Sequence, residues 1–271
     1  MVTIRRAVIP AAGLGTRMRE IAGDRPKELL PVGGRPVLRH AIDEALAAGL
    51  DEIAIVVSPA KDPIRSYVDE RIAAGKLAAK ITWVEQTVQR GLGDAMTRCR
   101  DFVAGEPFAL LLPDNVFLAP GYSLQPMVDL AIEHSRDVIG VVELGDDSSG
   151  KFGNCGRIDF RALAPGVLEI ERLDDKRPGK LQIPRGERVT RTCGRYVCRP
   201  DVLDVLEELR PETLAAGREL DEVPAYQRII AARGAIGCAL PPPLFDAGNP
   251  EGYAAANAYL SKHLSRQGQR P

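Results

Sequence analysis

The sequence predicts an α/β protein with an open, mostly parallel sheet, and three observations lead to that class. Strand-like and helix-like segments alternate from the start of the chain, as in proteins built from βαβ units. Two apolar runs, residues 53–57 and 108–112, lack polar alternation, which is typical of strands buried on both faces. A glycine-rich segment, residues 11–17, directly follows the first apolar run. Ligands of such sheets bind at the carboxyl ends of strands, so we expect a site at this segment and at Asp114.

The elements expected before residue 142 follow from the spacing of apolar residues. Val37, Leu38, Ala41 and Ile42 recur at helical intervals, and Gly49 follows at a position suited to a helix C-cap. Shorter apolar runs between turn residues predict strands. The expected strands are residues 7–10, 53–57, 81–84, 108–112 and 138–142, and the expected helices are residues 37–46, a stretch beginning at Pro63, and residues 94–103.

The pattern changes after residue 142, where short strands and loops replace the regular alternation. Glycine, proline and charged residues predict loops at residues 145–153 and 174–188. We expect a single domain over residues 1–264, made of parts 1–142 and 143–264, and a polar, frayed tail at 265–271. The second part is expected to hold strands at residues 157–160, 167–172 and 192–198, and helices at 201–209, 220–232 and 252–264.

Composition and charge exclude several classes of protein. The chain has 271 residues, with 36 Lys and Arg against 37 Asp and Glu, so its formal net charge is -1. Such a balance provides no global field for nucleic acid or an anionic membrane, and no apolar run reaches the roughly 18–20 residues that a bilayer requires. The 5 cysteines include no Cys-x-x-Cys pair, so neither a disulfide framework nor a zinc site is indicated. Cys193 and Cys198 should face opposite sides of one strand. We therefore expect a cytoplasmic protein.

The glycine-rich segment fits neither of two common phosphate-binding motifs. A dinucleotide fingerprint needs glycine at position 18, where Met18 stands, and the Gly-Lys-Ser/Thr of a Walker A loop is absent. What remains is a turn that presents backbone N–H groups, with Arg17 inside it and Lys27 shortly after it. Two cations beside such a turn suit a triphosphate. An ordinary strand–helix turn with surface cations is the alternative that composition leaves open.

Longer motifs make this segment more specific. Ala11-Ala12-Gly13-Leu14-Gly15-Thr16-Arg17-Met18 and Pro26-Lys27-Glu28-Leu29-Leu30-Pro31-Val32 resemble the signature of the nucleoside-triphosphate:sugar-1-phosphate nucleotidylyltransferases, most closely the bacterial UTP–glucose-1-phosphate uridylyltransferase family. The likeness continues in order through residues 47–53, 57–61, 85–86, 91–95, 112–114, 194–197 and 245–249. The resemblance implies a nucleotide-diphospho-sugar transferase-like (Rossmann-like) three-layer sandwich with a mixed, mostly parallel sheet. Residues 1–142 would then bind the nucleotide and residues 143–264 the sugar.

The resemblance also implies a metal site and a reaction. Asp114 and Asp246 would be the protein ligands of a catalytic Mg²⁺, which is usually held by few carboxylates together with phosphate oxygens and water. The alternative for Asp114 is a turn cap. A sugar-1-phosphate oxygen would attack the α-phosphorus of a nucleoside triphosphate and expel pyrophosphate. This nucleophile is already an anion, so no general base is needed, and positioning and charge neutralisation would carry catalysis. The 3 histidines of the chain accordingly fall in helix-like stretches, away from the loops.

The remaining residue roles are carried over from the family motifs. The catalytic residues would be Arg17, Lys27 and Lys176. The nucleotide would be bound by Ala11, Ala12, Gly13, Leu14, Gly15, Thr16, Gln86, Gly91 and Asp114, with Gln86 and Gly91 on the pyrimidine edge. Gln86 could instead be a solvated residue at a strand end. The sugar would be bound by Gly156, Asp175 and Lys176. The resemblance further implies a homo-oligomer, a dimer or a tetramer, although no stretch identifies an interface.

The departures from the family pattern cluster on the sugar side. This chain has Asp175 where the family has the longer glutamate, and Cys155 where the family has an aromatic residue. Its residues 219–224, Glu-Leu-Asp-Glu-Val-Pro, take the place of the family's Glu-Ile-Gln-Leu-Thr-Asp. Residues 33–36 are more similar to cytidylyl- and thymidylyltransferase relatives. A hydrogen-bonding pocket discriminates strongly among hydroxyl patterns, so the sugar need not be glucose, and dTTP follows UTP as the expected nucleotide. A non-catalytic sugar-nucleotide sensor and a dinucleotide-dependent oxidoreductase are the competing classes, and Met18 counts against the second.

Overall fold

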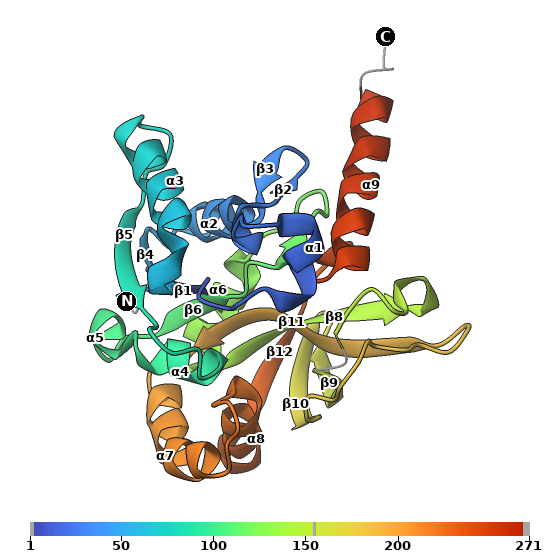
Figure 1. The fold of residues 1–271 in the computed structure, drawn as a ribbon. Coiled ribbons are helices and arrows are strands. Elements are labelled where there is room, and N and C mark those ends of the chain that lie inside the picture. Colours follow the sequence, from blue (N-terminus) through green and yellow to red (C-terminus); the bar gives the residue numbers. More distant parts are fainter. Residues whose placement is uncertain (1–2, 154–155, 268–271) are drawn as a thin grey trace.

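A nine-stranded sheet forms the centre of the protein, seen here in a computed structural model that describes residues 3–153 and 156–267 (Figure 1). Among the described strands of this sheet, β11 and β10 run against the direction of the others, so the predicted mixed and mostly parallel sheet is confirmed. In spatial order the strands are β5 (Lys80–Glu85), β4 (Glu52–Val57), β1 (Arg6–Pro10), β6 (Phe108–Leu111), β11 (Arg188–Cys198), β8 (Val138–Gly145), β12 (Ala235–Ala239), β10 (Val167–Leu173) and β9 (Ile158–Ala164).

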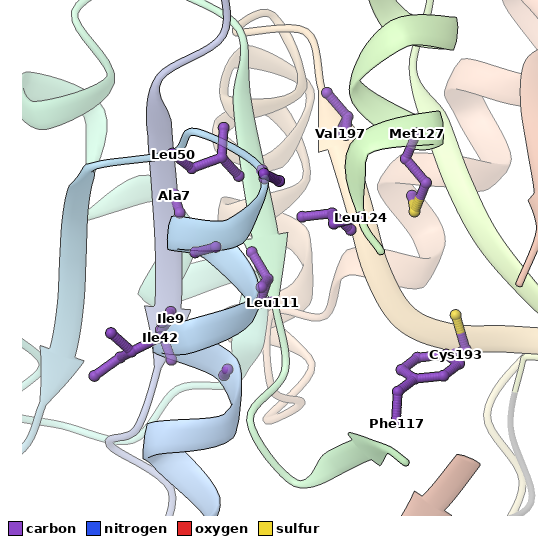
Figure 2. Packing of buried hydrophobic residues seen from close by; sticks show 14 of the residues in the cluster. Ala7, Ile9, Ile42, Leu50, Leu111, Phe117, Leu124, Met127, Cys193 and Val197 are labelled. Atoms are coloured by element: carbon purple, nitrogen blue, oxygen red, sulfur yellow. The ribbon is translucent and has the colours of Figure 1, made fainter. Parts of the chain in front are cut away.

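Helices cover both faces of the sheet and complete three layers (Figure 1). Side chains of α2 (Val37–Ala47), α3 (Asp62–Ala73) and α6 (Gln125–His134) belong to one hydrophobic core. The opposite core is formed with α4 (Leu92–Thr97), α5 (Arg100–Val103), α7 (Val202–Ala215) and α8 (Glu222–Arg233). Figure 2 shows the first core, where Ile42 of α2 and Met127 of α6 lie over the sheet.

Alternation along the strands sends side chains to the two cores in turn. Ala7 and Ile9 of β1 belong to the first core and Val8 to the second. Cys193 and Cys198 of β11 likewise belong to different cores, which confirms the prediction that they face opposite sides. A register irregularity lies between Thr192 and Tyr196 of this strand. All three histidines lie in helices, as expected.

Several predicted boundaries were wrong. The expected helix 94–103 is two short helices, since the chain leaves regular α-helical geometry between Thr97 and Arg100. Helix α5 ends at Val103, and Ala104 after it has the left-handed conformation. Helix α7 continues past the expected end at residue 209 and includes Pro211, because its buried apolar face offsets the single hydrogen bond that a proline removes. The last helix, α9 (Pro250–Gln267), includes residues 265–267 of the expected tail. None of the described helices is long and apolar enough to cross a membrane.

The strand order creates a topological switch point between β1 and β6. From β1 the chain moves outward to β4 and β5 and then returns to β6 on the other side of β1. The switch point between β1 and β6 is where open α/β sheets bind ligands, at the carboxyl ends of the strands. The remaining elements lie around this end or cover it: α1 (Arg19–Ala22), short 3₁₀ turns at Thr16–Met18, Lys27–Leu29, Pro59–Lys61 and Asp146–Ser148, and the strand pairs β2 (Pro31–Val32) with β3 (Arg35–Pro36) and β7 (Asn115–Phe117) with β13 (Leu244–Asp246).

Candidate active site

Two adjoining cavities open at this switch point. The larger cavity has a volume of about 640 Å³ and the smaller cavity about 560 Å³. Arg17, Leu112 and Asp114 line both, so the cavities meet at these residues. The predicted nucleotide residues line the smaller cavity, apart from the buried Ala11, which lies just behind it: Ala12, Gly13, Leu14, Gly15, Thr16, Gln86, Gly91 and Asp114.

The glycine-rich segment follows β1 and is held by a buried ammonium group. Lys61 Nζ donates to the carbonyl oxygens of Ala11 and Gly13, both at 2.7 Å, and to Glu28 Oε2 at 2.8 Å. Gly15 has φ +65°, a left-handed conformation that favours glycine, and it leads into the turn that carries Arg17. These contacts and the conformation of Gly15 give the segment a defined shape, with Arg17 exposed on it. The sequence reasoning missed Lys61, since no pattern marks a lysine as buried.

Lys27 and Asp114 form an ion pair at the junction of the cavities. Lys27 Nζ lies 2.6 Å from Asp114 Oδ2. Burial alone would lower the pKa of Lys27, but the Asp114 and Glu28 carboxylates raise it above its ordinary value. Burial opposes ionisation of Asp114, while Lys27 and Arg17 hold the pKa of its carboxyl below the usual range. The described hydrogen bonds of that carboxyl come from Lys27 and the Asn115 side chain, so Asp114 does not act as a turn cap.

Asp246 lies beside Asp114, as the family resemblance implied. Strands β7 and β13 pair with Asn115 opposite Asp246, and the Ala247 amide donates to the Asp114 carbonyl at 2.7 Å. A Cβ atom placed on Gly248 would lie 2.7 Å from Asp114 Oδ2 and 3.0 Å from Asp246 Oδ1, so the two carboxylates converge on one point. Burial and the Asp114 charge raise the pKa of Asp246. The pair thus concentrates negative charge that a hard cation would relieve.

Arg195 holds the turn that carries Asp114. Its guanidinium is fully buried and donates to the carbonyls of Leu112 at 2.8 Å and Asn115 at 2.6 Å, on either side of Asp114. The same group pairs with both oxygens of Glu44 in α2, at 2.6 Å and 2.7 Å. Arg195 lies within the Gly-Arg-Tyr-Val motif of residues 194–197, but no role was predicted for it. The turn that carries Asp114 is therefore anchored both to the sheet and to helix α2.

Gln86 is buried at the wall of the smaller cavity, which excludes the solvated strand-end alternative. Its Nε2 donates to the Gly91 carbonyl at 3.1 Å and to Asp94 Oδ2 at 2.8 Å. Gly91 has φ +102°, and a Cβ there would lie 2.3 Å from the Leu220 carbonyl oxygen. Glycine is therefore required at this position both for its backbone conformation and for space.

The residues predicted to bind the sugar are only partly brought together. Lys176 lines the larger cavity and pairs with Asp221 at 2.6 Å and Glu222 at 3.0 Å. Asp175 lies outside the lining of this cavity and accepts a hydrogen bond from Gln227 at 2.9 Å. Next to Lys176, the buried carboxyl that does line the larger cavity belongs to Glu222. The sequence predicted no role for Glu222, which belongs to the stretch 219–224 that differs from the family pattern.

Gly156 and its neighbour complete the predicted sugar side. A Cβ on Gly156 would lie 2.2 Å from Thr192 Oγ1, and Thr192 lines the larger cavity. The Thr192 amide donates to the Gly156 carbonyl at 2.7 Å, so Gly156 supports the cavity wall from behind. Cys155, predicted to replace an aromatic residue, lies outside the described residues.

Cations beside a strand-end loop and paired carboxylates at a topological switch point define an α/β enzyme that acts on phosphate esters of nucleotides. Residues 6–261 match the family described as nucleotidyl transferase, and the chain belongs to this family. It is similar to the UTP–glucose-1-phosphate uridylyltransferase of Staphylococcus epidermidis, with 30% identity over 84% of this chain and 82% of that protein. The corresponding protein of Bacillus subtilis is 29% identical over 84% of this chain and 81% of its own length.

Solved structures support the same fold. A UDP-glucose pyrophosphorylase complexed with UDP-glucose matches with a TM-score of 0.80 and 27% identity, over 96% of this chain and 100% of that one. A UDP-glucose pyrophosphorylase from Acinetobacter baumannii matches with a TM-score of 0.77 and 22% identity, over 98% of both chains. The predicted three-layer nucleotidyltransferase fold is thereby confirmed.

Proposed function

We propose that this nucleotidyl transferase moves a uridylyl group from UTP to a sugar-1-phosphate, either glucose-1-phosphate or a related sugar, and releases pyrophosphate. The observation that carries the proposal is the convergence of Asp114, Asp246, Lys27 and Arg17 where the two cavities meet. The relatives named for UTP and glucose-1-phosphate, and the matched structure in complex with UDP-glucose, support the choice of substrates.

The smaller cavity suits the nucleoside triphosphate. Its floor is the shaped loop at residues 12–16, and its junction with the larger cavity carries Arg17 and Lys27. Arg17 is exposed and makes no ion pair with another described residue, so its charge is available to the β- and γ-phosphates. Asp114 holds the Lys27 ammonium group at 2.6 Å, and from there Lys27 would contact the α-phosphate. Preorganised cations of this kind stabilise the charge that develops during transfer.

The larger cavity suits the sugar-1-phosphate. One phosphate oxygen of this substrate forms the new bond to the α-phosphorus while the bond to the bridging oxygen of the β-phosphate breaks. The bonding electrons leave with pyrophosphate, and no proton moves to or from the protein. Lys176 would position the sugar phosphate, and Glu222 at the wall would accept from or donate to a sugar hydroxyl. Positioning of the two substrates would add to the charge neutralisation that the cations provide.

The carboxylate pair fits a Mg²⁺ ion. Asp114 and Asp246 supply hard oxygen donors that converge on one point, and the raised pKa of Asp246 marks charge that lacks compensation. These two residues would hold the ion, whose other ligands would be phosphate oxygens and water. When bound, it would supply charge neutralisation to the triphosphate.

A grid of substrates tests the proposal. Pyrophosphate release is measured with Mg²⁺ while UTP, dTTP, CTP, GTP and ATP are crossed with a panel of sugar-1-phosphates. Release with UTP and glucose-1-phosphate is expected. Release with another pair would retain nucleotidyl transfer and reassign the substrates. Absence of release across the grid, with nucleotide binding intact, would contradict the proposed activity and favour a sensor.

The carboxylates provide a sharper test within that assay. Asp114→Asn and Asp246→Asn should each lower kcat by about 100-fold or more, because each removes a charge that neutralises or orients the reacting phosphates. Asp69→Asn, on the exposed side of α3, is the matched control and should leave kcat unchanged. Equal rates for Asp114→Asn and the control would remove Asp114 from the mechanism.

A further inference from the structure

The side-chain amide of Gln86 has a fixed orientation. Both N–H groups of Nε2 are used within the protein, one on the Gly91 carbonyl at 3.1 Å and one on Asp94 Oδ2 at 2.8 Å. Oε1 makes no hydrogen bond to any described residue. It is also accessible, because it does not belong to the fully buried polar atoms that lack a partner in the described part of the chain. Since Gln86 lines the smaller cavity, its exposed acceptor faces that cavity.

Asp94 enforces this orientation. Its side chain has 0% exposure and receives hydrogen bonds from Gln86, from Arg98 Nε at 2.9 Å and from Arg210 Nη1 at 2.6 Å. Burial opposes its ionisation, but these three donors lower the pKa of Asp94 below its ordinary value. An ionised carboxylate has only acceptors. A reversed Gln86 amide would therefore place its oxygen against a negative charge.

The backbone at Gly91 adds the complementary group. Its carbonyl is taken by Gln86, while its amide makes no hydrogen bond to another described residue. The wall of the smaller cavity thus offers an acceptor at Gln86 and a donor at Gly91. A base edge with an N–H next to a carbonyl, as in uracil, matches this arrangement. Cytosine has an unprotonated ring nitrogen at that place, which would face the Gln86 acceptor with a second acceptor.

We propose that Asp94 is a positioning residue that sets base selectivity by holding the Gln86 amide with its oxygen toward the nucleobase. The inference rests on the proposed function, since it concerns the same nucleotide site. Asp94 itself does not contact the nucleotide. Its partners Arg98 and Arg210 keep it charged, and the charge decides which face of the amide the base meets.

The test compares affinities for UTP and CTP, measured by calorimetry on the full chain, with pyrophosphate release followed in parallel. In Asp94→Asn the new side-chain amide can donate to Gln86 Oε1, so the Gln86 amide can reverse. The preference for UTP over CTP should fall by about 10- to 100-fold, the usual value of a paired base contact. The double variant Asp94→Asn/Arg210→Gln also removes the positive charge that Asp94 would leave unpaired. It should show the same fall in the preference for UTP, and it replaces the single variant in the test if that variant does not fold.

The outcomes separate this inference from the proposed function. A variant that weakens UTP and CTP binding equally, leaving the preference unchanged, would assign Asp94 a structural role and overturn the inference. A wild-type protein without preference for UTP would overturn it as well. Intact UTP preference without pyrophosphate release would contradict the proposed function alone, because the binding ratio does not depend on turnover.

Discussion

At the scale of single residues, buried charges determine the shape of the site. Lys61 and Glu28 form an ion pair whose side chains are 11% and 2% exposed, and the same ammonium group holds two carbonyls of the glycine-rich loop. Removing one partner of such a pair leaves an uncompensated charge in the interior, which costs more than the pair itself contributes. The loop therefore depends on a residue that need not touch the substrate.

Lys61→Met should lower the free energy of unfolding by about 3–5 kcal/mol, because Glu28 is left buried and unpaired. It should also raise KM for the nucleotide, since the loop carbonyls lose their donor. Urea unfolding and steady-state kinetics measure the two effects. Lys80→Met removes a 74% exposed lysine near Glu52 and should change stability by less than about 1 kcal/mol. Similar losses in the two variants would contradict the structural role of Lys61.

The site residues divide by the kind of signal they leave in the sequence. Arg17 and Lys27 could be identified because Arg17 lies in the glycine-rich loop and Lys27 in the family motif that follows it. Asp114 and Asp246 are far apart in the chain, and only the family resemblance paired them. Lys61, Asp94 and Glu222 could not be predicted, because their roles follow from burial and from partners supplied by other elements. A single sequence indicates neither whether a charged residue is buried nor which residue pairs with it.

At the scale of elements, the segment before α4 is joined to the segment before α8. The Leu220 amide donates to the Arg90 carbonyl at 2.7 Å, and the Gly93 amide donates to the Leu220 carbonyl at 2.8 Å. The two segments approach so closely at Gly91 that no side chain fits there. This contact closes one wall of the smaller cavity, to which Glu219 also contributes.

Gly91→Ala should therefore destabilise the protein by more than the about 1 kcal/mol expected from backbone conformation alone. The added Cβ would meet the Leu220 carbonyl oxygen at 2.3 Å, so the two segments must separate. Gly75→Ala is the matched control: Gly75 has φ +65° but nothing within 4 Å of its Cβ position. Thermal unfolding and KM for UTP measure the effect. A loss of stability no larger than that of Gly75→Ala would contradict the prediction, since the two segments could then separate at little cost.

Elements were predictable where periodicity alone decides them. The buried strands at residues 52–57 and 108–111 and helix α2 follow from apolar spacing. The break between α4 and α5 does not follow from this spacing. The pairing of β7 with β13 does not follow either, because it joins segments that are distant in the chain. The β7–β13 pairing is the one that brings the two carboxylates together. Local pattern therefore predicts the sheet but not the step that completes the site.

At the scale of the whole molecule, ionic contacts connect the two parts of the chain and segments within the second. Arg195 of β11 joins Glu44 of α2, and Lys176, in the loop after β10, joins Asp221 and Glu222 at the start of α8. The Lys176 ammonium group thus faces two carboxyls, so its single positive charge cannot neutralise both. Burial raises the pKa of Glu222 to about 8, although Lys176 opposes the shift. The pKa of Asp221 is lowered, burial being outweighed by its hydrogen bonds and by Lys176.

This carboxyl should make global stability depend on pH. The folded pKa of Glu222 lies above its ordinary value of 4.5, so the folded state binds the proton more tightly than the unfolded state. Its stabilising contribution is complete below pH 4.5 and is lost as the pH rises through about 8. Between these values the free energy of unfolding should fall with a slope approaching about 1.4 kcal/mol per pH unit.

Urea unfolding of the wild type and of Glu222→Gln at a series of pH values isolates this effect. The variant has no titrating proton at this position, so its stability relative to the wild type should rise from pH 5 to about pH 8 and then level off. Titrating groups that do not interact with Glu222 are common to both proteins and cancel in the difference. Parallel profiles for the two proteins would mean that Glu222 is already ionised at pH 5, with Lys176 compensating its charge in full. A second pair, wild type and Glu171→Gln, serves as the control, because Glu171 is 55% exposed and its substitution should leave the profile unchanged.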